Sequence, residues 1–278
     1  MENSEQKQID IAKVLTAKGI KPRRWIVRLL NRILHVDEIN EALALNDDKE
    51  GAEFAQGIID YLQITVELRN AERIPKDGNP IIIANHPLGG PDGLALIAAV
   101  GKVRKDILFP VNDFLMYVKR LEPVFVPIDK VHGNRNTSEG INAAFAGQNM
   151  LLYFPAGLCS RRIKGKIMDL EWKSTVVKKA IQHHRDLIPV YIEAKNRRRF
   201  YTIANLRKRL GIKFNFEMAL LPGEMFAQRG KTFRMTVGEP IPWQTFDSRH
   251  TAAEWAAMLR DFVYELKDNP DAEFKIND

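Results

Sequence analysis

The sequence has a single cysteine, no long apolar run and no motif typical of nucleic-acid binding. Cys159 has no second cysteine to pair with, which excludes an intramolecular disulfide and fits a reducing compartment. The N-terminal residues mix acids with lysines and lack the apolar stretch of a signal peptide. Since no run of about 18 apolar residues occurs, we expect no transmembrane helix. Neither a paired-cysteine zinc spacing nor an aromatic RNA-binding motif is present, so nucleic acid is not an expected partner.

The composition is that of a folded protein with an excess of positive charge. The chain has 278 residues, of which 45% are hydrophobic, so a sizeable core is available. Forty-two Lys and Arg against 35 Asp and Glu give a formal net charge of +7 and a pI near 9.4. This balance favours polyanionic partners such as anionic lipid headgroups or an acidic protein, without selecting one of them.

The pattern of apolar residues divides the chain into a helical segment over residues 1–62 and an α/β domain over residues 63–278. In the second part, short β-branched runs alternate with helical patterns, which predicts a largely parallel central sheet flanked by helices. The expected strands are 64–68, 80–84, 107–110, 124–128, 150–154, 187–193, 214–221 and 232–237. The expected helices are 92–101, 135–147, 173–184 and 251–267.

The segment 23–34 combines an arginine row with an apolar face. Arg24, Arg28 and Arg32 recur every four residues and so share one side of a helix. The other side carries Trp25, Ile26, Leu29, Leu30, Ile33 and Leu34. This pattern is typical of a helix that lies on a membrane surface, although a helix packed on the core with a solvated charged face would show it too. A second basic run, 195–199, predicts the start of a solvated helix, with a phosphate or lipid site as the alternative.

A candidate catalytic pair follows the strand at 80–84, where Asn85-His86 and a turn rich in Gly and Pro lead to Asp92. Ligand sites of open α/β sheets form at the carboxyl ends of strands. An imidazole there can accept a proton near neutral pH, and a nearby carboxylate fixes its tautomer. A lone histidine after a strand is usually structural, so the prediction depends on the whole arrangement of Asn85, His86 and Asp92. Gly89 and Gly90 allow the chain to fold back between them.

A second turn after an apolar strand ends in two arginines, Arg161 and Arg162. Guanidinium groups beside turn amides can form an anion site, although a basic residue after a strand is commonplace. Ser160 lacks the Gly-x-Ser-x-Gly elbow of a serine hydrolase. Cys159 has no evident activating partner, so we expect this cysteine to be structural or incidental. His183 and His184 are adjacent on an expected helix and have no partner at ligand spacing, so we expect no metal.

Together these segments resemble the glycerolipid (lysophospholipid) acyltransferase family over residues 64–242. Asn85-His86 and Asp92 match its first block, but five residues lie between His86 and Asp92 where the family typically has four. This longer spacing is similar to that of a hemolysin-like bacterial subgroup, which includes O-acyltransferases of ornithine and glycine lipids. Its second block is matched loosely by 124–130, its third by Phe154-Pro155 and Gly157, and its fourth by 187–192. Ala156 stands where the family has a glutamate. The turn at 238–241 is also similar.

The resemblance implies transfer of an acyl group from a thioester to a lipid hydroxyl, with His86 as general base oriented by Asp92. It implies no cofactor or metal, and either acyl carrier protein or acyl-CoA as donor. Substrate contacts are expected from Asn85, Lys130, Gly157, Arg161 and Arg162. Backbone amides near Gly89, Gly90 or Gly157 are expected to stabilise the oxyanion. The location implied is the cytoplasmic face of the cell membrane, on an anionic surface.

The replacement of the family's glutamate by Ala156 bears on the acceptor. In the family this glutamate helps to organise the site for a glycerol-phosphate group. Its absence favours an amino-acid lipid whose carboxylate pairs with Arg161 or Arg162. Lysophosphatidic acid is the alternative acceptor. A hydrolase and a non-enzymatic lipid-binding or membrane-perturbing protein are alternatives of other classes.

Overall fold

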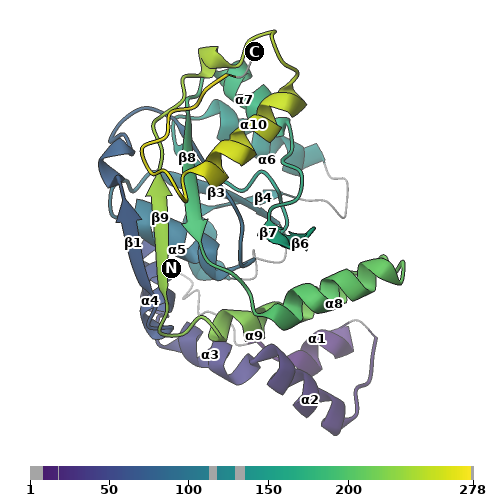
Figure 1. Cartoon of the computed structure of the whole chain (residues 1–278). Coiled ribbons are helices and arrows are strands. Elements are labelled where there is room, and N and C mark those ends of the chain that lie inside the picture. Colours follow the sequence, from purple (N-terminus) through teal and green to yellow (C-terminus); the bar gives the residue numbers. More distant parts are fainter. Residues whose placement is uncertain (1–8, 18, 113–117, 129–134, 277–278) are drawn as a thin grey trace.

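The computed structural model describes residues 9–17, 19–112, 118–128 and 135–276, and it shows one seven-stranded sheet between layers of helices (Figure 1). The strand order is β1-β9-β8-β2-β5-β3-β4. From β8 to β4 all neighbours are parallel, whereas β9 runs antiparallel to β8 and parallel to β1. The predicted largely parallel α/β fold is confirmed. The strands are β1 (Thr65–Arg69), β2 (Ile81–Ala84), β3 (Ile107–Asn112), β4 (Phe125–Ile128), β5 (Met150–Tyr153), β8 (Leu187–Glu193) and β9 (Thr232–Val237).

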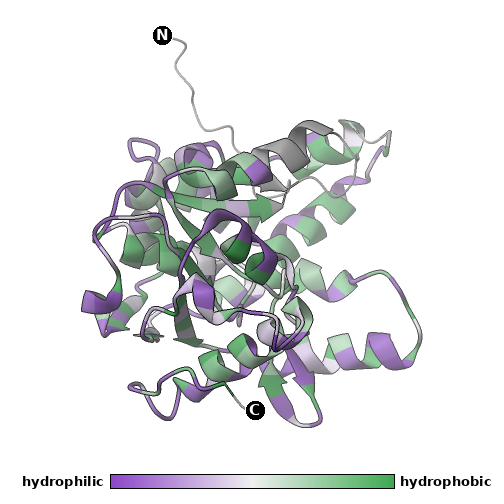
Figure 2. Cartoon of the chain, turned by 90° about the horizontal axis from the view of Figure 1, so that it is seen from above, coloured by the Kyte–Doolittle hydropathy of each residue, from purple (hydrophilic) through white to green (hydrophobic). Residues whose placement is uncertain are grey.

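Strand β2 lies at the centre of the sheet and is buried on both faces. Ile82 and Ala84 point into one core, and Ile81 and Ile83 point into the other, because successive side chains of a strand alternate between faces. Strands of this kind are continuously apolar, and hydrophobic residues line the sheet in Figure 2. One face is covered by α4 (Gly51–Tyr61) and α5 (Pro91–Val100), the other by α6 (Arg135–Ala146), α7 (Thr175–His183) and α10 (Ala252–Glu265).

The described part of the N-terminal segment is largely helical, as predicted. Before α4 it contains α1 (Ile11–Ala17), α2 (Arg24–Leu34) and α3 (Val36–Ala44). Helix α2 has no buried residue. The six residues predicted to contact a membrane are all exposed on it: Arg24, Trp25, Arg28, Leu29, Arg32 and Ile33. Within the described residues, no helix combines the length and the apolar character needed to cross a bilayer.

The predicted strand over 214–221 is wrong. This segment forms the 3-10 helix η4 (Phe216–Leu220) and the start of helix α9 (Leu221–Phe226). Its apolar residues alternate, but Phe214 and Phe216 are exposed rather than packed against a neighbouring strand, so the alternation does not mark a sheet face.

The basic run at 195–199 leads into helix α8 (Arg198–Arg209), as predicted, but it is not fully solvated. Arg197 and Arg199 both pair with the buried Glu224 of α9, at 3.1 and 2.9 Å. The remaining short elements are the 3-10 helices η1 (Ala71–Arg73), η3 (Lys119–Val124) and η5 (Trp243–Thr245).

A small antiparallel hairpin of β6 (Arg161–Ile163) and β7 (Lys166–Met168) was not predicted. Its two-residue turn places Lys164 and Gly165 at φ 47° and 86°. Two successive positive φ values are typical of the tight turns that match the twist of a hairpin. Both predicted arginines, Arg161 and Arg162, lie in β6.

Candidate active site

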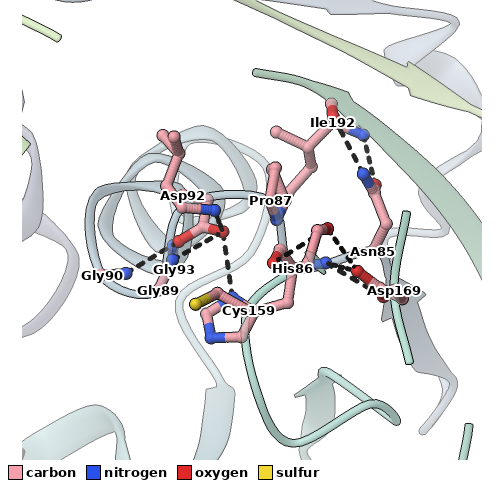
Figure 3. A network of polar contacts seen from close by, with 12 residues as sticks. Asn85, His86, Pro87, Gly89, Gly90, Asp92, Gly93, Cys159, Asp169 and Ile192 are labelled. Carbon is pink, nitrogen blue, oxygen red and sulfur yellow. Dashed lines mark hydrogen bonds and ion pairs between the residues drawn. The ribbon is translucent and has the colours of Figure 1, made fainter. Parts of the chain in front are cut away.

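His86 and Asp92 meet in the turn that leads from β2 to α5. Nδ1 of His86 lies 2.9 Å from Oδ2 of Asp92 (Figure 3). The imidazole stacks on Phe154, which follows β5, with ring centroids 4.2 Å apart. The side chain of His86 is 16% exposed, whereas Asp92 is fully buried. The carboxyl ends of two neighbouring strands therefore place one partly exposed imidazole against a buried carboxylate.

The carboxylate of Asp92 is held by four backbone N–H groups, three from the turn before α5 and one from the first turn of α5. Oδ2 accepts from Leu88 at 2.8 Å and Gly89 at 3.4 Å, and Oδ1 accepts from Gly90 at 3.0 Å and Gly93 at 3.1 Å. The N-terminus of a helix also stabilises negative charge. Burial alone would raise the pKa of Asp92, but the neighbouring His86 and the amides outweigh it and lower the pKa.

The pKa of His86 shifts in the opposite direction. Burial disfavours the charged imidazolium, but the charge of Asp92 and its hydrogen bond outweigh this effect and raise the pKa above the ordinary value of about 6.5. An ionised carboxylate can only accept, so Nδ1 of His86 is the donor. This hydrogen bond leaves Nε2 as the nitrogen that can accept a proton from a bound molecule.

The N–H groups of the turn glycines already have acceptors within the protein. Those of Gly89 and Gly90 donate to Asp92, and that of Gly157 donates to the carbonyl of Phe154 at 3.0 Å. Gly89 has φ 93°, and a Cβ there would lie 3.0 Å from Leu221. A glycine at this position is therefore needed both for the backbone conformation and for space.

Asn85 is a buried connector between strands. Its side-chain amide donates to the carbonyl of Ile192 at 3.0 Å, and its side-chain oxygen accepts from the N–H of Ile192 at 2.6 Å (Figure 3). The side chain thus continues the β2–β8 pairing beyond the end of β2. Both polar atoms of the Asn85 side chain are therefore used to fix the backbone directly before His86.

Asp169, which sequence reasoning missed, fixes the backbone behind His86. Both of its oxygens lie 3.2 Å from the N–H of His86, and it accepts from Ser160 Oγ at 2.7 Å and Trp172 Nε1 at 2.9 Å. The N–H of Ser160 in turn donates to the carbonyl of His86 at 2.7 Å. Burial raises the pKa of Asp169. No local spacing in the sequence links Asp169 to His86, since they are 83 positions apart.

Arg161 and Arg162 have different surroundings, although both contact helix α8. Arg161 is buried, donates to the carbonyl of Cys159 at 2.6 Å and pairs with Glu217 at 3.5 Å. Arg162 donates to Oγ1 of Thr202 on α8 at 3.3 Å. Lys130 lies outside the described residues.

Cys159 is a free thiol in the interior of the protein. Cys159 is buried, and burial raises the pKa of its thiol to about 11, which fits a structural residue. No group of three or more His, Cys, Asp or Glu in the described part of the chain could hold a metal ion.

The chain as a whole matches a family of known proteins. A family model described as acyltransferase matches residues 13–273. The chain belongs to this acyltransferase family. Two lyso-glycine lipid O-acyltransferases are similar to it. The protein from Phocaeicola vulgatus is 44% identical, and the match covers 93% of this chain and 95% of that protein. The protein from Bacteroides thetaiotaomicron is 43% identical, and the match covers 93% of this chain and 97% of that protein. The acyltransferase is therefore an enzyme that acylates oxygen, and the predicted family is confirmed.

Among solved structures, the crystal structure of the 1-acyl-sn-glycerophosphate (LPA) acyltransferase PlsC from Thermotoga maritima is similar to this chain. The two share 19% sequence identity, and the match covers 95% of this chain and 90% of PlsC with a TM-score of 0.47.

Replacing Asp92 by Asn should lower the pKa of His86. The substitution keeps the shape of the side chain and removes the charge that stabilises the imidazolium. In an NMR titration of the His86 ring, we expect a pKa above about 6.5 in the wild type and a lower value in Asp92→Asn. Asp261→Asn, an exposed aspartate of α10, is the control and should leave the titration unchanged. Identical titrations in wild type and Asp92→Asn would contradict the assigned pairing.

Replacing Asp169 by Asn should destabilise the protein, because an amide cannot accept from His86, Ser160 and Trp172 together. Leaving buried donors without a partner costs about 1–3 kcal/mol, so the free energy of unfolding in urea should fall by about that amount. Asp268→Asn, at an exposed aspartate beyond α10, is the matched control. An unchanged unfolding midpoint in Asp169→Asn would show that this carboxylate does not hold the site.

Proposed function

We propose that the protein transfers a fatty acyl group from an acyl thioester to the hydroxyl of a lyso-glycine lipid. The observation that carries the proposal is the contact of 2.9 Å between Nδ1 of His86 and the amide-held carboxylate of Asp92. The acceptor is supported by the names of the two relatives that match nearly their whole length. The likeness to PlsC carries no weight for lysophosphatidic acid as acceptor.

In the proposed reaction, Nε2 of His86 removes the proton from the acceptor hydroxyl as the oxygen attacks the thioester carbonyl carbon. The carbon–sulfur bond breaks as the tetrahedral intermediate collapses. The departing thiolate then takes the proton from His86 and is released as the thiol. Asp92 keeps Nδ1 protonated and stabilises the positive charge that develops on the ring. Because the thiolate is a good leaving group, the proposal needs no covalent enzyme intermediate and no metal.

We propose Arg162 as the partner of the acceptor's carboxylate. Arg161 is committed to Cys159 and Glu217, whereas Arg162 contacts a hydroxyl and pairs with no described carboxylate. Ala156, where the family has a glutamate, is packed into the core with Trp172 and adds no negative charge that would repel such a headgroup. These features favour a carboxylate-bearing acceptor.

The donor and the location are also part of the proposal. Either acyl carrier protein or acyl-CoA, both anionic, is compatible with the net charge of +7. The exposed side chains of Trp25, Leu29 and Ile33 on α2, flanked by arginines, support contact with the anionic cytoplasmic face of the cell membrane.

Replacing His86 by Ala should abolish most acyl transfer without unfolding the protein. General base catalysis contributes about 10²- to 10⁴-fold, so the turnover number should fall by that factor. The assay would incubate labelled acyl thioester with purified wild type, His86→Ala or His250→Ala. The last variant is the control, because His250 lies outside the site. Parallel reactions would contain lyso-glycine lipid or lysophosphatidic acid.

The products distinguish the alternatives. The proposal predicts His86-dependent product on lyso-glycine lipid, with His250→Ala active. Product on lysophosphatidic acid alone would retain the chemistry and reject the acceptor. Free fatty acid in reactions without acceptor would indicate a hydrolase. Vesicle binding without turnover of any substrate, by folded protein, would indicate a lipid-binding protein.

A further inference from the structure

A second apolar surface, separate from α2, lies at the end of α8 and in the segment that follows it. Its exposed large side chains are Leu206, Leu210, Ile212, Phe214 and Phe216. Phe214 is 78% exposed and Leu210 65%, compared with 60% for Trp25 on α2. Thirteen large apolar side chains are exposed in the described part of the chain, and ten of them lie in residues 11–34 and 206–216. Exposed apolar area is therefore concentrated in two segments rather than scattered.

The positive charge of the chain is concentrated in and next to the same two segments. Residues 11–34 contain seven Lys and Arg. Residues 194–216 contain eight, of which four lie within 206–216, and neither range contains Asp or Glu. Since the whole chain has a formal charge of +7, the remainder is net −8. Lys208, Arg209 and Lys213 form no ion pair with a described residue. Apolar side chains and unpaired cations thus share one surface, which suits an anionic lipid interface.

The two segments lie next to each other in space. Helix α2 packs against η4 and α9, and α8 packs against η4. Figure 1 shows α1, α2 and α8 together beside the sheet, with α8 projecting beyond it. The two apolar and basic segments therefore belong to one side of the molecule.

Buried ion pairs connect this surface to the catalytic turn. Glu217, at the start of η4, is fully buried and pairs with Arg207 at 2.8 Å and with Arg161 at 3.5 Å. Arg161 follows Ser160, which donates to the backbone of His86. Arg207 within the segment 206–216, and Glu217 directly after it, are thereby linked through Arg161 to the catalytic turn.

We propose that residues 206–216 form a second membrane-contact element, which lies with α2 on an anionic bilayer and brings the catalytic turn to the lipid surface. The partner is the bilayer rather than acyl carrier protein, because a highly exposed Phe and Leu interspersed with cations gain more from acyl chains and headgroups than from an acidic protein. The inference builds on the proposed membrane-bound acceptor, but binding to vesicles is measured without turnover.

The test is sedimentation of the full chain with vesicles of phosphatidylcholine containing phosphatidylglycerol. We expect Leu210→Ser/Phe214→Ser and Lys208→Glu/Arg209→Glu each to weaken binding by about tenfold or more, since apolar burial and basic charge both contribute. The control for the apolar variant is Leu45→Ser, because Leu45 is 61% exposed but lies beside Asp47 and Asp48. The control for the charge variant is Lys102→Glu/Lys105→Glu, at two exposed lysines after α5. Thermal unfolding of each variant establishes that it is folded.

Loss of binding in both test variants with retention in both controls supports the proposal. Unchanged vesicle binding in the test variants overturns it. Unchanged vesicle binding with loss of binding to acyl carrier protein also overturns it, and assigns the surface to that protein. Turnover of substrates dispersed in detergent distinguishes failure of the membrane proposal from failure of the proposed function. Test variants that turn over substrate in detergent but bind vesicles weakly have lost membrane contact alone. A wild type that binds vesicles but turns over no substrate contradicts the proposed function and leaves the membrane contact supported.

Discussion

The site depends on one buried carboxylate. Asp92 is removed from water in the first turn of α5, and an isolated buried charge would be very costly. Four backbone N–H groups and the imidazole of His86 compensate for the lost water. The geometry of the turn therefore follows from satisfying this charge. The same contacts fix the tautomer of His86, which makes Nε2 the nitrogen available to a substrate.

Much of this arrangement could be predicted from the sequence because its signals are local. The apolar run at 80–84 predicts a buried strand, and Asn85-His86 at its end predicts a side chain at the carboxyl edge of the sheet. The glycines that follow allow a turn that returns to Asp92. His86 and Asp92 are six positions apart in the sequence, so no long-range information is needed to bring them together.

The parts that could not be predicted depend on contacts between distant segments. Asp169 reaches the backbone of His86 across 83 residues. The different partners of Arg161 and Arg162 come from the distant segments that contain Glu217 and Thr202. Alternating apolar residues at 214–221 suggested a strand, but that pattern arises from exposed side chains of Phe214 and Phe216. These apolar side chains belong to no sheet face. The wrong strand prediction therefore falls on the same residues that we propose to contact the membrane.

The pH dependence of acyl transfer tests the central claim most directly. A general base must be neutral, so kcat/KM should rise with pH and level off above the pKa of His86, which Asp92 raises above about 6.5. In Asp92→Asn the rising limb should move to lower pH and the plateau should fall. A limb at the same pH in wild type and Asp92→Asn, or a rate independent of pH across the titration of His86, would contradict the account.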